Sequence, residues 1–165
     1  MPPARVLGLA LALLALPALA RAEPSGGEPS GLTLDASLGG GGEMGLSHGK
    51  PGVLEIEAVV GYAFREQGLR PELALALGIA PDTNVGIRPG LRWSVPESPF
   101  QLRGALDAAN ARSSGWHWRW LLVGVAGELR VTSLFGFFGE VDTGVPLSSR
   151  FGVPLLLRAG ASFRF

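Results

Sequence analysis

The chain has no cysteine, and Lys50 is the only lysine among its 165 residues. The absence of cysteine excludes disulfide bonds, thiolate metal sites and a lipoprotein anchor. The two histidines, His48 and His117, are far apart in the sequence, so we expect neither a metal site nor a cofactor. Lysine is one of the residues that soluble proteins place at their surface, and its scarcity argues against an ordinary water-exposed surface.

Long apolar runs are also missing, except at the N-terminus. There, Arg5 precedes a Leu/Ala-rich run over residues 6–19, and Ala20-Arg21-Ala22 fits the small-x-small cleavage rule. A run of 14 residues is shorter than the roughly 20 that a membrane-spanning helix needs. We therefore expect residues 1–22 to be a signal peptide cleaved after Ala22, and residues 23–30 to be a flexible leader.

The charge is balanced, with 14 basic and 14 acidic residues. Loss of Arg5 and Arg21 with the signal peptide leaves 12 basic residues against 14 acidic ones, a net charge of −2. This gives no electrostatic reason to expect a nucleic-acid partner. Glycine is abundant, at 25 residues, but most of it lies inside alternating segments, so the chain is not of low complexity.

Beyond residue 30, apolar and polar side chains alternate, as in β-strands whose two faces meet different environments. The pattern predicts eight strands, over residues 32–38, 53–65, 69–80, 85–95, 100–108, 116–129, 131–142 and 153–165. The phase of the sixth strand is ambiguous, and the best fit places Leu121, Val123, Val125 and Leu129 on its apolar face. Pro89, in the middle of the fourth strand, removes one backbone donor and predicts a bulge or local kink.

Two kinds of barrel fit these strands. A soluble, lipocalin-like barrel buries its apolar face, whereas a membrane barrel turns that face to lipid and its polar face to the lumen. The polar face here mixes glycine, alanine and serine with arginine and acids. That mixture favours a crowded lumen, because arginine forms fixed pairs with carboxylates better than lysine does.

The aromatic residues and the connections favour the membrane barrel as well. Short connections near residues 66–68, 96–99 and 130 alternate with longer ones, the first over residues 39–52, although the short connection 81–84 breaks this pattern. The aromatics sort by height, as expected of residues at membrane interfaces. The expected interface aromatics are Tyr62, Phe64, Trp93 and Phe100 at one rim, with Trp116, Trp118 and Trp120 at the other.

The last strand ends on Phe165, with Leu155, Leu157, Ala159, Ala161 and Phe163 on the same face. With the eight alternating segments, this ending resembles small outer-membrane β-barrels such as the OmpA membrane domain and OmpX. The resemblance implies an all-β, eight-stranded antiparallel up-and-down transmembrane barrel over residues 31–165. It also implies a location in a Gram-negative-type outer membrane. In that family, the final strand guides insertion by the barrel-assembly machinery, which gives Phe163 and Phe165 the role of an assembly signal.

The predicted inner face carries a cluster of acidic and basic side chains, and this is the one group of residues in the sequence that suggests a specific property. The expected lumen charge network consists of Asp35, Glu55, Glu57, Arg65, Glu72, Arg88, Arg92, Arg103, Asp107, Glu128, Glu140, Arg158 and Arg164. A porin-like charged pore and an ion-pair plug both fit this pattern. Eight strands leave an interior about wide enough for side chains, which favours the plug.

No motif predicts catalysis. His117 follows Ser113 and Ser114 closely near the expected outer rim, which is the one hint of a lipid hydrolase, but a girdle histidine explains it as well. Gly49-Lys50 is followed by proline and does not match a phosphate-binding loop.

We expect a monomeric, non-enzymatic barrel with a structural or surface-interaction role. We expect the outer loops 39–52 and 143–152 to be contact surfaces for an unknown ligand. The alternatives are a narrow channel for small solutes and a lipid hydrolase at the rim.

Overall fold

The computed structural model describes residues 30–45, 52–64, 68–80, 83–111 and 115–165. The predicted signal peptide and almost all of the predicted leader lie outside the described residues. So do several residues that the sequence singled out, namely His48, Lys50, Arg65, Ser113 and Ser114.

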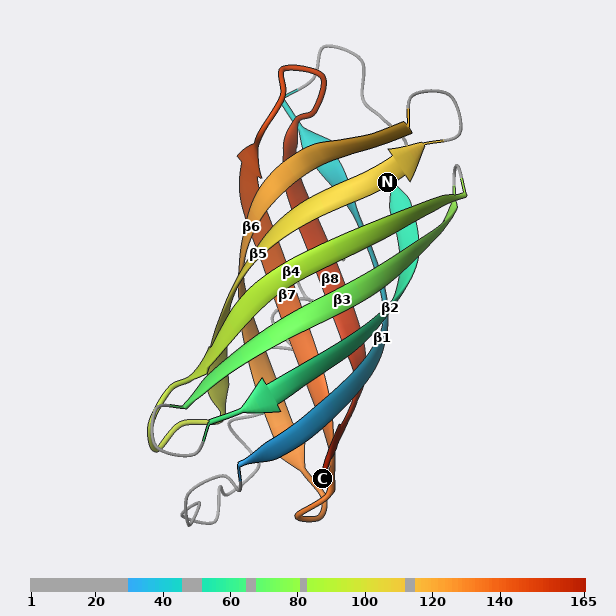
Figure 1. The fold of residues 1–165 in the computed structure, drawn as a ribbon. Coiled ribbons are helices and arrows are strands. Elements are labelled where there is room, and N and C mark those ends of the chain that lie inside the picture. Colours follow the sequence, from blue (N-terminus) through green and yellow to red (C-terminus); the bar gives the residue numbers. More distant parts are fainter. Residues whose placement is uncertain (1–29, 46–51, 65–67, 81–82, 112–114) are drawn as a thin grey trace, which may run out of the picture.

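The described residues form eight antiparallel strands that close into a barrel (Figure 1). The strands are β1 (Gly31–Met44), β2 (Val53–Ala63), β3 (Leu69–Ala80), β4 (Asn84–Ser94), β5 (Phe100–Ala111), β6 (Gly115–Arg130), β7 (Phe135–Pro146) and β8 (Val153–Arg164). Each strand pairs with the next along the chain, and β1 pairs with β8. The predicted eight-stranded antiparallel up-and-down barrel is therefore confirmed. Within the described residues, no helix is long and apolar enough to cross a membrane.

The barrel wall is apolar outside and polar inside. On β3, the outward-facing Leu73 and Leu75 are 51% and 54% exposed. Glu72, on the same strand but facing the lumen, is only 6% exposed. On β8, Leu157 points outward and Arg158 inward, as the alternation of the last strand predicted. Burial of charge and exposure of leucine is the reverse of the arrangement in a soluble barrel.

The first strand is longer than predicted. The sequence placed its end at Leu38, but β1 continues through four glycines to Met44. It stays paired with β2 as far as Gly41 and with β8 as far as Met44. A Cβ atom at Gly39 would collide with the Arg158 side chain, and one at Gly41 would collide with the carbonyl oxygen of Leu155. These glycines therefore serve the close approach of backbones at the β1–β8 seam, and their interpretation as a surface loop was wrong.

The seventh strand is also displaced from its predicted bounds, residues 131–142. The alternation continues through Val131 and Leu134, but residues 131–134 form a turn in which Thr132 Oγ1 accepts hydrogen bonds from the amides of Leu134 and Phe135. As a result β7 starts at Phe135 and runs to Pro146. The predicted outer loop 143–152 shrinks to residues 147–152.

A β-bulge in β6 explains the ambiguous phase of that strand. Asp107 of β5 pairs with Trp120, while Ala108 pairs with Trp118, so Arg119 is an extra residue. Before the bulge Trp118 points outward, and after it Trp120 points inward. The predicted outward placement of Leu121, Val123, Val125 and Leu129, all of which follow the bulge, is confirmed.

The ladder between β4 and β5 is interrupted at Pro89. Pairing stops at Ile87–Ala108 and resumes at Gly90–Ala105 without a change of register. Proline has no amide hydrogen to donate, so it cannot complete the ladder at this position. The predicted bulge or kink is thus a local gap in backbone pairing with the register kept.

Candidate functional site: the charged lumen and its cap

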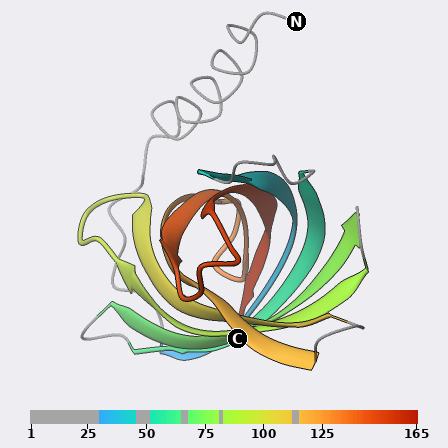
Figure 2. The same ribbon diagram turned by 90° about the horizontal axis from the view of Figure 1, so that it is seen from above.

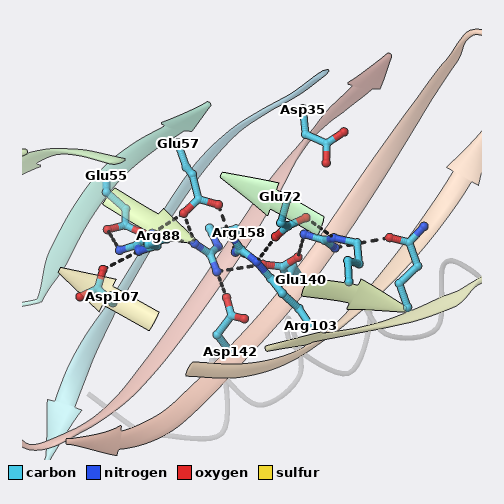
Figure 3. A network of polar contacts seen from close by, with 12 residues as sticks. Asp35, Glu55, Glu57, Glu72, Arg88, Arg103, Asp107, Glu140, Asp142 and Arg158 are labelled. Atoms are coloured by element: carbon cyan, nitrogen blue, oxygen red, sulfur yellow. Dashed lines mark hydrogen bonds and ion pairs between the residues drawn. The ribbon is translucent and has the colours of Figure 1, made fainter. Parts of the chain in front are cut away.

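Among the described residues, all eight strands contribute charged side chains to the lumen. Figure 3 shows part of this network. The arginines are Arg70, Arg88, Arg92, Arg103, Arg119, Arg158 and Arg164. The acids are Asp35, Glu55, Glu57, Glu72, Asp107, Glu128, Glu140 and Asp142. Seven positive and eight negative groups nearly cancel, so the interior is close to neutral while being densely charged.

Arg88 on β4 anchors one end of this network. Its side chain is fully buried, and its Nη1 and Nη2 atoms lie 2.6 and 2.7 Å from the two carboxylate oxygens of Glu55. Nη1 also contacts Glu57, and Nε lies 2.6 Å from Oδ1 of Asp107. This complete pairing is needed because an unpaired charge buried away from water costs several kcal/mol.

Two shared carboxylates occupy the centre of the network. Glu140 on β7 lies 2.6 Å from Nη2 of Arg92, 2.9 Å from Nη1 of Arg103 and 2.8 Å from Nη2 of Arg158. Glu57 on β2 pairs with Arg103 and Arg158 at 3.1 and 2.6 Å. Since these arginines come from β4, β5 and β8, the shared acids connect strands across the lumen.

The network continues to the end of the barrel at which β8 finishes. Arg70 on β3 lies 2.6 Å from Asp35 on β1. Arg164 on β8 lies 2.5 Å from Glu128 on β6, which also accepts hydrogen bonds from the Gln101 amide at 2.6 Å and the Ser162 hydroxyl at 2.9 Å. All eight strands are therefore joined through side chains as well as through backbone ladders.

The predicted lumen residues point inward and take part in these pairs. The one exception is Arg65, which lies outside the described residues. The sequence prediction missed Arg70, Asp142 and Arg119. Arg70 has the same alternation as Glu72, and Asp142 the same as Glu140, so both could have been found from the strand pattern. Arg119 could not, because the bulge that turns it inward leaves no mark in the alternation.

The loop 147–152, which we call the cap, lies over the mouth of the barrel that the sequence predicts to be the outer one. Figure 2 shows this loop lying across the barrel opening. The amide of Gly152 donates to Glu43 Oε2 at 2.8 Å, and its carbonyl accepts from Trp120 Nε1 at 3.0 Å. The Phe151 ring packs edge-on against Trp120, with 5.8 Å between centroids, and this pair lies next to buried Leu122.

The prediction that Trp120 is a membrane-interface residue was wrong. Its side chain is only 2% exposed and lies inside the barrel under the cap, with the Arg119 guanidinium 4.4 Å from its ring. The bulge at Arg119 reverses the alternation, so Trp120 cannot share a face with Trp118. Its indole N–H finds a carbonyl partner, as buried tryptophans usually do.

The other predicted interface aromatics point outward. Trp116 and Trp118 are about half exposed near the start of β6. The remaining four lie at the opposite rim, and they are Tyr62, Phe64, Trp93 and Phe100. Phe163 and Phe165, the predicted assembly signal, are also exposed at this rim, and Phe163 packs against Phe135 with ring centroids 5.1 Å apart. The outward-facing aromatics thus form two bands separated by aliphatic residues.

His117, the residue behind the hydrolase alternative, lies at the outer mouth. Its ring stacks on Phe151 with 5.4 Å between centroids, and its Nδ1 lies 3.1 Å from the carbonyl oxygen of Gly115. These contacts place the ring against the cap. Ser113 and Ser114 lie outside the described residues, so their relation to His117 stays a prediction.

Solved structures with this fold are known. The crystal structure of neisserial surface protein A is 16% identical and covers 86% of this chain and 100% of its own, with a TM-score of 0.53. The N-terminal β-barrel domain of Pseudomonas aeruginosa OprF is 12% identical and covers 83% and 100%, with a TM-score of 0.55. At these identities the likeness shows the fold alone, and the predicted resemblance to small eight-stranded outer-membrane barrels is confirmed at that level. No protein-family model matches the chain, and no curated protein matches its sequence.

Proposed function

We propose that this chain is an outer-membrane β-barrel protein with a structural or surface-interaction role, and that its lumen is plugged. In this proposal the barrel is a monomer surrounded by outer-membrane lipid, inserted by the barrel-assembly machinery after cleavage of the signal peptide. The observation that carries the proposal is the reversed polarity of the wall, because a leucine-rich exterior over buried ion pairs suits lipid and not water.

The spacing of the two aromatic bands supports the membrane assignment. On β5, ten residues separate Phe100 at one rim from Asn110, which pairs with Trp116 at the other. At about 3.4 Å per residue and a tilt of about 40°, these ten residues span about 26 Å along the barrel axis. The apolar band of an outer-membrane barrel is about 25 Å tall. The aromatics therefore lie where the two interfaces of such a membrane would be.

The burial of the arginines supports a plug over an open channel. The side chains of all seven lumen arginines are between 0% and 9% exposed. In a water-filled pore, guanidinium groups would keep part of their surface in contact with solvent. Ion pairs occupy the interior, and the cap covers the outer mouth.

The surface role is proposed for the outer connections, of which the cap is the best described. One solved barrel with this fold is named a surface protein, which agrees with the proposal.

We assign no catalytic role to His117, because its ring is engaged with Phe151 and Gly115. Lipid analysis of cells that produce the wild type or His117→Ala tests this assignment. Lipid cleavage that depends on His117 would contradict it.

Two measurements on the detergent-folded protein test the proposal. A closed membrane barrel should migrate faster on a gel when unboiled than when boiled, and identical mobility would contradict the barrel in detergent. In planar bilayers, the plugged lumen should give no steady ion conductance. A stable single-channel current would contradict the plug and favour the narrow channel, and it would leave the membrane location intact.

A further inference from the structure

Two irregularities of the barrel wall meet at Asp107 on β5. On the β4 side, the ladder is interrupted at Arg88 and Pro89, directly opposite Asp107 and Leu106. On the β6 side, the bulge at Arg119 shifts the register between Asp107 and Ala108. The backbone pairing of β5 is therefore irregular toward both neighbours at the same height.

Asp107 makes side-chain contacts across both irregularities. Its Oδ1 lies 2.6 Å from Nε of Arg88, the residue opposite it in the β4 gap. Its Oδ2 lies 2.6 Å from Nε of Arg119, the extra residue of the β6 bulge, and Oδ1 lies 3.1 Å from Nη2 of the same group. The Asp107 side chain is fully buried, so both pairs are shielded from water.

We infer that Asp107 is a staple that holds β4, β5 and β6 together where their backbone pairing is irregular. Strands in a barrel wall are normally held by ladder hydrogen bonds, and a missing donor such as that of Pro89 leaves a point at which neighbours separate more easily. Charge-assisted hydrogen bonds are about twice as strong as neutral ones, so this carboxylate can replace lost ladder contacts. The inference rests on the barrel fold, and it stands whether or not the lumen conducts.

The lumen offers a matched control in Asp142 on β7. Its side chain is also fully buried and contacts an arginine, Arg158. Asp142 pairs in unshifted register with Gly124 on β6 and Leu156 on β8. The two aspartates thus share charge, burial and pairing with arginine. They differ in that Asp107 contacts two arginines on two strands, Asp142 contacts one, and only Asp107 lies where the backbone pairing is irregular.

Hydrogen–deuterium exchange of the refolded full-length barrel, followed by mass spectrometry, tests the staple. In Asp107→Asn, we expect the amides of residues 87, 88, 90 and 105–108 to exchange at least about tenfold faster than in the wild type. In Asp142→Asn, exchange in these segments should stay within about twofold of the wild type. Equal acceleration in both variants, or acceleration spread over all strands, would overturn the inference.

Two further variants keep the test decisive. Pro89→Val restores the missing donor, so in the Asp107→Asn background it should slow exchange at residues 87–90, and no slowing there would count against the staple. Should Asp107→Asn not fold, Arg119→Gln removes only the β6 contact and should accelerate exchange around the bulge while sparing β4. If the amides around the bulge exchange at the same rate in Arg119→Gln as in the wild type, the inference is overturned for the contact between β5 and β6.

Discussion

Single residues in the lumen are stabilised by several partners at once, and Arg92 is an example. Its Nη2 atom lies 2.6 Å from Glu140 and its Nε atom 3.1 Å from Glu72. Arg88 on the same strand has a different set of partners, which includes Asp107, the residue directly across the β4–β5 gap.

Removal of Arg92 should destabilise the barrel strongly. We expect Arg92→Ala to lower the free energy of unfolding by roughly 3–5 kcal/mol, the scale for breaking a buried ion pair. In a hydrated pore, water would replace the guanidinium and the loss would be about 1 kcal/mol or less. Urea unfolding of the folded barrel measures the difference, with exposed Arg130→Ala as the control. An Arg92→Ala midpoint equal to that of the wild type would contradict the plug.

Among the structural elements, we expect the cap to limit access to the part of the lumen beneath it. Leu122 is 1% exposed beneath it, and Phe151 is the cap residue that packs on this apolar cluster. Because the chain has no cysteine of its own, single introduced cysteines report access without background. We expect the cysteine of Leu122→Cys to react slowly with a charged thiol reagent, and at least about tenfold faster when Phe151→Ala is added.

A cysteine at exposed position 147 serves as the control for this labelling experiment. It should react quickly in both backgrounds, since it lies on the outer side of the cap. Rapid labelling of Leu122→Cys with the native cap present would show that the cap does not close the mouth.

The final strand is the second element with a testable role. The amide of Phe165 donates to the carbonyl of Leu32 at 2.9 Å, which extends the β1–β8 seam to the last residue of the sequence. We expect Phe165→Asp to reduce the amount of folded protein in the outer membrane severalfold more than Leu134→Asp in the turn before β7. The reason is that a seam left open would place unpaired backbone groups in lipid. Equal amounts of folded protein for the two variants would contradict this role.

At the scale of the whole molecule, the sequence was sufficient for the fold and for most of the lumen. Alternation identified the eight strands and the inward face of Glu57, Arg88 and Arg158, because a period of two is imposed wherever the two faces of a strand differ. Alternation carries no information about a one-residue bulge, so Arg119 and Trp120 were misplaced. Alternation also does not distinguish a glycine-rich strand that packs closely on its neighbour from a glycine-rich loop. The glycines of β1 were therefore interpreted as part of a loop.

The reversed polarity of the wall also constrains the order in which the barrel can form. A half-closed sheet in lipid would present Arg88, Arg103 and their carboxylates to hydrocarbon before their partners on β2, β3 and β7 arrive. Each such exposed ion costs several kcal/mol, whereas the finished barrel pairs them all. For a barrel inserted as proposed, partly closed states are therefore strongly disfavoured. We expect insertion and closure to be one cooperative step, in which the charges enter the membrane already enclosed by their own wall.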